Sequence, residues 1–367
     1  MLGTWQDKLA NRTQDGTLRT LKLHRDRVDF ASNDYLGLAR NPLFQGELRN
    51  IVLKNPSALM GATGSRLISG NTKVQEEVES FLAQRYNVES ALLMPSGYIA
   101  NLSLLSSLGL RGDTILVDEL IHRSVHDGCQ MSAATKWKFR HQDLNHLESL
   151  LKKASGQIWV LVESIYSMDG DIAPLADLID LTEAYGANLI VDEAHAVGVY
   201  GNGLVYEQGL MKRVFATVIT FGKAMGLHGA AVLSSRALKD YLVNFASPVI
   251  YSTGNSDLMA LSIQAAYQFI DANPILRKQL QERIVYFNAH SKRAGNKVLF
   301  SAIQPIIVPE LNVLKSKAEE LDRAGLSVYP VMPPTVPLNT GRLRVCLHAH
   351  NSFAEIDRLK GILKEYL

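Results

Sequence analysis

The sequence predicts an α/β fold in which a mostly parallel central sheet is covered by helices, with a smaller α+β domain toward the C-terminus. Short apolar runs alternate with helical patterns from residue 114 to residue 220, which is typical of a parallel sheet with helices on both faces. After about residue 255 this alternation ends, and a chain of 367 residues is long enough for a second domain. We therefore expect an N-terminal arm over 1–40, a large α/β domain over 41–255 and a small α+β domain over 256–367.

The first hundred residues predict several short elements. The pattern predicts an amphipathic helix and a polar connection over 1–24, and then a short strand in RVDFASNDYLGL that ends near Asn33. The Gly- and Ser-rich residues 60–71 predict a loop, whereas apolar residues at helical spacing predict a helix over 72–86. SALLMPSGYIAN then predicts a strand, a tight turn and the start of a helix.

Four buried strands follow, and polar side chains cluster where these strands end. The predicted strands are TILVD (114–118), QIWVLVES (157–164), ANLIVDEAH (187–195) and VFATVIT (214–220). The polar residues at their ends are Asp118, His122, Glu163, Ser167, Asp192, His195, Thr220 and Lys223. Because ligands of such sheets bind beyond the carboxyl ends of the strands, this placement predicts an active site there.

The remainder of the chain predicts the smaller domain. A long helical stretch begins near residue 256, and GRLRVCLH predicts a strand close to the C-terminus. Ser352, followed by Glu355 three residues later, predicts a capping box at the start of the final helix.

Composition narrows the class of protein. The net charge is +2 without any basic run of five residues, so neither nucleic acid nor a membrane surface is an expected partner. Cys129 and Cys346 are too few for a disulfide framework, and His122 with His126 lacks a third ligand, so we expect no metal site. No stretch approaches the ~20 apolar residues of a membrane span, and no signal peptide is evident. We expect a cytoplasmic enzyme or binding protein.

Lys223 is the unusual residue among these strand ends. It follows the apolar run VFATVIT and precedes small residues, and an ammonium group is costly to desolvate in such surroundings. Forming an imine lowers that cost, and desolvation itself favours the nucleophilic amine. The alternative is a lysine on a strand-to-helix loop with its head in water.

The neighbouring groups supply what an imine-forming lysine needs, although each has a simpler alternative. Asp192 could hold a heteroaromatic nitrogen protonated or cap the next helix, and His195 could donate to a ring oxygen or be structural. The turn at residues 96–98 could bind phosphate through backbone N–H groups or be a plain turn. His122 could stack on a planar ring or cap a helix. Together these groups specify pyridoxal phosphate, a phosphorylated pyridine aldehyde that binds lysine as a Schiff base.

Seven blocks of the sequence resemble, in order, the blocks of a known family. They are SNDYLGL, GSRLISGN, SGYIAN, SIYSMDGD, VDEAHAVGV, TFGKAMGLHGAA and PPTVP. Over nearly its whole length the chain resembles the α-oxoamine synthases, which are fold-type I pyridoxal-phosphate-dependent transferases. The resemblance implies a homodimer with its site at the interface.

The resemblance also implies roles for individual residues. Those implied for the cofactor are Lys223 as the Schiff-base lysine, Asp192 at the pyridinium nitrogen, His195 at the ring hydroxyl, His122 on the ring face, Ser167 facing the ring, Gly97, Tyr98 and Thr220 at the phosphate, and Thr253 reaching the phosphate of the partner subunit. Those implied for the substrate are Glu163 near the reacting amino acid, Asn33 and Arg344 at the amino-acid carboxylate, Arg19 at the acyl chain or its carrier, and Thr335 as a further substrate-binding residue. The expected catalytic residues are Lys223, His122, Asp192, His195 and Glu163.

The activity that the resemblance implies is a decarboxylative condensation of an amino acid with an acyl thioester. PPTVP and SNDYLGL favour the branch that joins L-alanine to a pimeloyl thioester, carried by coenzyme A or an acyl-carrier protein, in biotin biosynthesis. The alternative is a sister enzyme that uses glycine or serine. One position departs from this branch: the residue before PPTVP is commonly an arginine thought to bind a carboxylate, and here it is Met332. Arg344 or another cation would then anchor the substrate.

Overall fold

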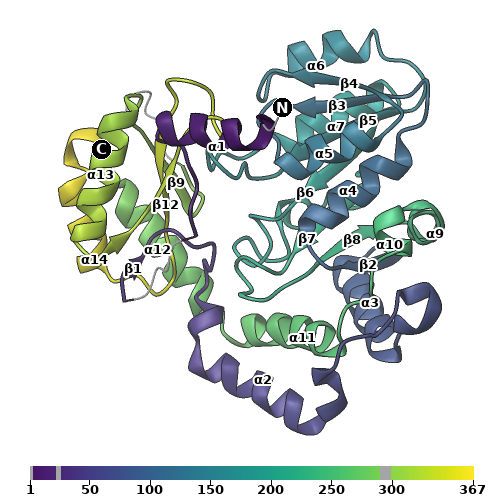
Figure 1. The fold of residues 1–367 in the computed structure, drawn as a ribbon. Helices are drawn as coiled ribbons and strands as arrows, with labels where there is room; N and C mark the ends of the chain where they lie inside the picture. Colours follow the sequence, from purple (N-terminus) through teal and green to yellow (C-terminus); the bar gives the residue numbers. More distant parts are fainter. Residues whose placement is uncertain (1–2, 22–25, 290–298) are drawn as a thin grey trace. The chain divides into compact units, whose positions relative to one another are not determined.

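The computed structural model describes residues 3–21, 26–289 and 299–367, so part of the polar connection predicted over 1–24 lies outside the described residues (Figure 1). The chain divides into a larger unit, Asn33–Gln281, and a smaller unit made of the residues before and after it. By this division the helix α11 (Asp257–Ala272) belongs to the larger unit. The domain boundaries expected from the sequence, after residues 40 and 255, stay a prediction.

A seven-stranded sheet forms the centre of the larger unit (Figure 1). In spatial order its strands are β2 (Ser90–Met94), β8 (Ala230–Ser234), β7 (Ala216–Thr220), β6 (Asn188–Asp192), β5 (Ile158–Glu163), β3 (Thr114–Asp118) and β4 (Thr135–Phe139). The five strands from β7 to β4 run parallel, whereas β8 is antiparallel to both of its neighbours. The predicted mostly parallel sheet and its four predicted strands are therefore confirmed.

Helices cover the sheet because the strands are apolar on both faces. α4 (Gly97–Leu108), α5 (Arg123–Met131) and α9 (Arg236–Phe245) share one buried cluster with strand residues such as Val117 and Val232. The alternate strand residues, including Leu116 and Val191, are buried as well. The other helical elements of this unit are η1 (Leu38–Arg40), α2 (Pro42–Lys54), η2 (Pro56–Leu59), η3 (Arg66–Gly70), α3 (Lys73–Tyr86), α6 (Leu144–Leu151), α7 (Leu175–Ala184), α8 (Leu204–Glu207) and α10 (Ser247–Ile250).

The loop predicted over residues 60–71 is only partly a loop, because η3 is a short π-helix. The carbonyl of Ser65 accepts from the N–H groups of Ser69 and Gly70, at 3.1 and 2.9 Å. The guanidinium of Arg66 pairs with Glu79, whose side chain is 2% exposed, and thereby anchors the turn to α3. A Gly- and Ser-rich composition predicts a turn, but it does not predict the ion pair between Arg66 and Glu79.

The smaller unit contains two short sheets and several helices (Figure 1). β11 (Tyr329–Val331), β12 (Arg342–Cys346) and β9 (Ile303–Ile307) form an antiparallel sheet, and β1 (Val28–Asp29) pairs in parallel with β10 (Leu326–Ser327). The helices are α1 (Thr4–Gln14), α12 (Ile275–Asn288), which begins in the larger unit, α13 (Leu311–Arg323), α14 (Phe353–Ile362) and η4 (Lys364–Tyr366). The predicted capping box of Ser352 and Glu355 is confirmed at the start of α14.

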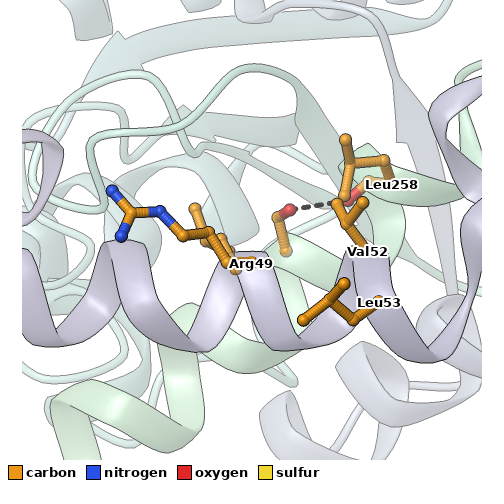
Figure 2. A pocket seen from close by; sticks show the side chains of 6 residues that line it. Arg49, Val52, Leu53 and Leu258 are labelled. Atoms are coloured by element: carbon orange, nitrogen blue, oxygen red, sulfur yellow. Dashed lines mark hydrogen bonds between the residues drawn. The ribbon is translucent and has the colours of Figure 1, made fainter.

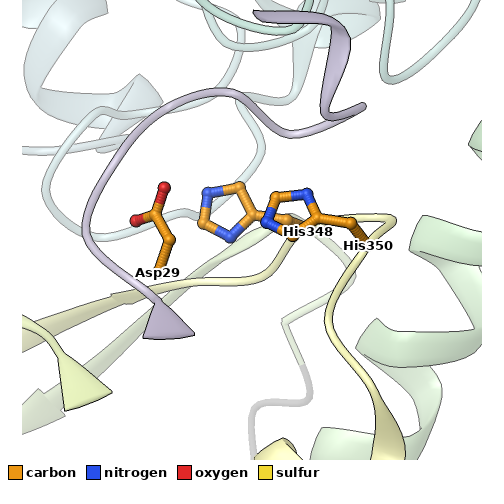
Figure 3. Close-up of side chains that lie close together, drawn as sticks. All are labelled: Asp29, His348 and His350. Carbon is orange, nitrogen blue, oxygen red and sulfur yellow. The ribbon is translucent and has the colours of Figure 1, made fainter. Parts of the chain in front are cut away.

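Asp29, His348 and His350 form a compact polar group in the smaller unit (Figure 3). The two imidazole rings stack with centroids 4.9 Å apart. The carboxylate of Asp29 accepts the N–H groups of Ala31 and Ser32, and His348 Nε2 lies 3.0 Å from the carbonyl oxygen of Ser32. Because hydrogen bonds already engage Asp29 and His348, we assign no metal to the group.

Candidate active site

The carboxyl ends of the parallel strands open into a cavity of about 270 Å³ in the larger unit. The predicted site residues that line it are Asn33, Gly97, Tyr98, His122, Glu163, Asp192, His195, Thr220 and Lys223. Ser167 and Thr253 do not line it, whereas Arg19, Thr335 and Arg344 belong to the smaller unit. The structure therefore brings nine of the fourteen predicted residues together around one cavity.

Lys223 lies on a tight loop between β7 and β8. The loop is closed by hydrogen bonds from Phe221 N to Gly229 O at 3.0 Å and from Leu227 N to Phe221 O at 2.9 Å. Gly226 has a φ of 62°, and a Cβ there would lie 2.4 Å from a backbone nitrogen, so this turn requires glycine. The loop places Lys223 Nζ 3.3 Å from Thr220 Oγ1, at the wall of the cavity.

Asp192 ends β6, and its carboxylate is held by two donors. Oδ1 accepts from Ala194 N at 2.9 Å, and Oδ2 accepts from Asn101 Nδ2 at 2.7 Å. The next helix, α8, begins at Leu204, so Asp192 does not cap it. The sequence reasoning missed Asn101, although its position four residues after Gly97 in α4 places it on the same helix face.

Glu163 ends β5 and is 2% exposed. Its Oε2 accepts from Ser167 N at 3.0 Å, and its Oε1 is buried without a hydrogen-bond partner in the described part of the chain. Burial, together with the nearby charge of Asp192, raises the pKa of Glu163 well above its usual value. The neutral acid is therefore favoured, and it can donate a proton or a hydrogen bond.

His122 caps α5, which is one of the two roles that the sequence left open, and it also lines the cavity; its stacking on a ring stays a prediction. Its Nδ1 accepts from Ser124 N at 3.3 Å and lies 2.8 Å from Ser124 Oγ. Burial and the charge of Lys223 lower the pKa of His122, although Asp192 acts in the opposite sense. The ring of Tyr98 meets the ring of His122 edge to face, with centroids 6.4 Å apart.

His195 is held by a tyrosine that sequence reasoning missed. Tyr35 is 1% exposed, and its hydroxyl oxygen lies 2.8 Å from His195 Nδ1. The same hydroxyl donates to Asn33 Oδ1 at 3.0 Å, so Nδ1 of His195 carries the proton of the histidine–tyrosine bond. Tyr35 lies within SNDYLGL, but a tyrosine in an apolar block is not by itself a signal of a site.

The start of α4 and the end of β7 approach each other closely at Gly97. A Cβ at Gly97 would lie 2.5 Å from Thr220 Cγ2, so a larger residue would not fit there. Ser96 caps the helix by accepting from Ile99 N. The N–H groups of Gly97 and Tyr98 belong to the first turn, which has no intrahelical acceptors, and they suit a phosphate group.

The predicted residues outside the cavity have clear local partners. In the smaller unit Arg19 Nη2 donates to Thr335 Oγ1 at 2.8 Å, and the 5% exposed Arg344 places Nη1 2.9 Å from Cys346 Sγ. In the larger unit Thr253 forms an isolated β-bridge with Ser65.

A second hollow in the larger unit, about 450 Å³, lies between α2 and α11 (Figure 2). Leu48, Val52, Leu53 and Leu258 line it, and Ser262 Oγ donates to the carbonyl of Leu258. Arg49 is its only ionisable lining residue. This hollow lacks the paired acid, base and nucleophile groups of the cavity at the strand ends.

The class of protein that this fold and cavity define is that of the pyridoxal-phosphate-dependent enzymes. The family model for aminotransferase class I and II matches residues 25–362, and the chain belongs to this family.

Named relatives agree with the resemblance to α-oxoamine synthases and with fold type I. An 8-amino-7-oxononanoate synthase from Emericella nidulans is 36% identical over 389 residues, 99% of this chain and 93% of the relative. A solved serine palmitoyltransferase from S. paucimobilis with bound PLP has a TM-score of 0.87 at 25% identity, covering 98% of this chain and 96% of that chain. A solved 8-amino-7-oxononanoate synthase from Francisella tularensis has a TM-score of 0.78 at 27% identity, and the match covers 92% of this chain and 97% of that chain. The protein is an enzyme whose cofactor is pyridoxal 5′-phosphate.

The residues of the cavity fit this cofactor. The close approach of Gly97 to Thr220 places the N–H groups at the start of α4 and the Thr220 side chain on the same stretch of the cavity wall, where they suit a phosphate. The buried, unpartnered Oε1 of Glu163 shows a polar group at the cavity wall that the described residues leave unsatisfied. An amine, two carboxyl groups and three imidazoles complete a set of polar groups suited to a substituted pyridine.

Proposed function

We propose that the protein condenses L-alanine with a pimeloyl thioester, releasing CO₂ and the free thiol and forming 8-amino-7-oxononanoate, in biotin biosynthesis. The observation that carries this proposal is the full-length match to 8-amino-7-oxononanoate synthases, at 36% identity over 99% of this chain. The acyl group would arrive on coenzyme A or on an acyl-carrier protein.

The roles that we propose for the side chains are supported by their positions around the cavity. Bound pyridoxal phosphate supplies an electron sink for the Cα of the amino acid. Lys223 would hold the cofactor through its Nζ, and the same amine would move the Cα proton of the amino acid. Asp192 would hold the ring nitrogen. His195 would hold the ring hydroxyl through Nε2, because its Nδ1 is engaged by Tyr35.

The remaining cavity residues orient the reactants in this proposal. His122 would lie against the ring of the bound cofactor. Ser167 supports the site through its N–H bond to Glu163, and Glu163 would donate to the substrate as a neutral acid. Asn33 receives the carboxylate of the amino acid. The amide of Asn33 is held for this role by the Tyr35 hydroxyl.

The acyl side involves residues of the smaller unit. Thr335 lies in the block that follows Met332, and Arg19 donates to its hydroxyl at 2.8 Å. Arg19 thereby brings a cation to the segment that follows position 332, where this branch commonly has an arginine. We propose that Arg19 contacts the acyl chain or its carrier. Arg344 is proposed for the carboxylate of the amino acid.

We also propose a homodimer in the cytoplasm, with Thr253 reaching the phosphate of the partner subunit. None of the helices in the described ranges is long and apolar enough to cross a membrane. The dimer is supported by the resemblance and by exposed apolar side chains on the larger unit, such as Ile68 at 84%.

The test is to incubate the purified protein and pyridoxal phosphate with a pimeloyl thioester and alanine, glycine or serine. The product is then identified by mass spectrometry. We expect the mass of 8-amino-7-oxononanoate with alanine, and a loss of turnover of about a thousandfold or more in Lys223→Ala. Full turnover by that variant, with an unchanged absorption band of the cofactor, would contradict the role of Lys223.

The second candidate is a sister enzyme that uses glycine or serine. It is favoured by the TM-score of 0.87 to a serine palmitoyltransferase. Product formation with serine or glycine alone in the same assay would establish this candidate and exclude the alanine reaction.

A further inference from the structure

The lining of the cavity contains few positively charged side chains for a phosphorylated cofactor. A phosphate monoester carries a charge of about −1.5 to −2 at pH 7. Lys223 is the only lysine or arginine among the described residues that line the cavity. Because its Nζ is assigned to the aldehyde carbon, the described lining residues leave no lysine or arginine for the phosphate.

Three histidines line the cavity, and two of them are already engaged. His122 is held by Ser124 at 2.8 Å, and His195 is held by Tyr35 at 2.8 Å. The third, His228, is exposed and forms no hydrogen bond or ion pair with the rest of the described chain. Its imidazole is therefore available to a ligand.

The register of the sheet places His228 beside the start of α4. Ala230 at the start of β8 pairs with Met94 of β2 on one side and with Thr220 of β7 on the other. The ladder continues one step further through the bond from Phe221 N to Gly229 O at 3.0 Å. If the register of β2 and β8 is extrapolated by two residues, His228 is level with residue 96, and residues 96–98 line the same cavity as His228.

We propose that His228 binds the phosphate of pyridoxal 5′-phosphate by donating an imidazole N–H to a phosphate oxygen. The N–H groups of Gly97 and Tyr98 and the hydroxyl of Thr220 complete the phosphate site. Either protonation state of imidazole offers at least one N–H donor, and the charged state offers two. The inference rests on the assigned cofactor and on its proposed orientation, but it does not depend on which acyl thioester reacts.

The test compares two forms of the cofactor that differ only in the phosphate. Apoenzyme is titrated with pyridoxal 5′-phosphate and with pyridoxal, and the Kd of each is taken from the absorption band of the lysine adduct. In His228→Ala we expect the Kd for pyridoxal 5′-phosphate to rise about tenfold or more, because a hydrogen bond to a charged group is lost. The Kd for pyridoxal is expected to stay unchanged, which also shows that the variant is folded.

Two further variants sharpen the comparison. His228→Gln keeps an N–H donor, so it is expected to recover part of the lost affinity. Arg111→Ala removes an exposed cation from the turn that precedes β3, at the amino-terminal edge of the sheet, and is expected to leave both Kd values unchanged.

Three results would overturn the inference. An unchanged Kd for pyridoxal 5′-phosphate in His228→Ala means that the imidazole does not bind the phosphate. Equal losses for both ligands assign His228 to the ring or to the local fold. A change confined to the KM of the thioester assigns it to the acyl carrier instead. Wild-type protein that binds neither ligand would contradict the cofactor assignment itself, which separates that failure from the others.

Discussion

At the scale of single residues, Asn101 joins two parts of the site that lie far apart in the sequence. Its Nδ2 donates to Asp192 Oδ2 at 2.7 Å and to Ser124 Oγ at 3.0 Å. Ser124 Oγ in turn lies 2.8 Å from His122 Nδ1. One hydrogen-bonded chain therefore connects the acid proposed for the ring nitrogen with the imidazole proposed for the ring face, and we infer that Asn101 positions both.

Asn101→Ala is expected to lower kcat/KM by about tenfold to a hundredfold, because a hydrogen bond to a charged group contributes about 1.5–3 kcal/mol. The pH at which the absorption band of the bound cofactor changes is expected to move as well, since the ring nitrogen senses Asp192. A loss of packing alone would leave the pH of this absorption change where it is in the wild type. Steady-state kinetics and an absorption titration measure the two effects.

Ser124→Ala is the matched control for Asn101, since it cuts the chain toward His122 but keeps the donor to Asp192. Its effect on the absorption titration is expected to be smaller. If Asn101→Ala titrated as the wild type does, Asn101 would be a packing residue only.

At the scale of elements, His141 ties together the ends of three neighbouring strands. It follows β4, and its ring nitrogens lie 3.0 Å from Asp118, which ends β3, and 2.7 Å from Asp171, in the loop after β5. Burial opposes a charge on the imidazole, but the hydrogen bonds to the two carboxylates outweigh it and raise the pKa of His141 to about 10. This group holds the loop that carries Ser167.

The raised pKa of His141 gives the stability of the fold a defined pH dependence. Because an unfolded histidine titrates near 6.5, the contribution of His141 is fully present below about pH 6.5 and is lost as the pH rises toward 10. His141→Gln is expected to lower the free energy of unfolding by about 3 kcal/mol at pH 6, and by progressively less at higher pH. Urea unfolding of the apoenzyme between pH 6 and 10 measures this.

His146→Gln, on α6, is the control for this pH dependence and is expected to change the unfolding free energy little. A difference between wild type and His141→Gln that stayed constant from pH 6 to pH 10 would show that His141 acts through packing and not through its charge.

The elements also show what could be predicted from the sequence. Parallel strands such as β3 and β6 were predictable because a buried run is apolar throughout, and polar residues such as Asp192 follow it directly. The antiparallel direction of β8 could not be predicted, because an apolar run reads the same for a parallel and an antiparallel strand. Asn101, Tyr35 and His141 were missed for a related reason: each acts through a contact with a residue from another segment, and a single sequence does not report such pairs.

At the scale of the whole molecule, two segments of the larger unit expose large apolar side chains. Ile68 in η3 is 84% exposed, and Tyr251 after α10 is 81% exposed. The segments are joined by the bridge between Ser65 and Thr253. Apolar side chains gathered at a surface are typical of protein–protein interfaces. Together with the resemblance, this supports the proposed homodimer, and we predict that η3 forms part of its interface.

Ile68→Glu is expected to convert the dimer to monomer at micromolar concentration, because a charge placed in a buried interface is costly to desolvate. Sedimentation velocity measures the change, and Leu110→Glu, which alters an apolar side chain that is 59% exposed before β3, is expected to remain dimeric. The monomer is also expected to bind pyridoxal 5′-phosphate more weakly, since Thr253 is proposed to reach the phosphate of the partner subunit. A monomer with unchanged cofactor affinity would separate the two ideas: η3 would still form the interface, but Thr253 would not complete the site of the partner.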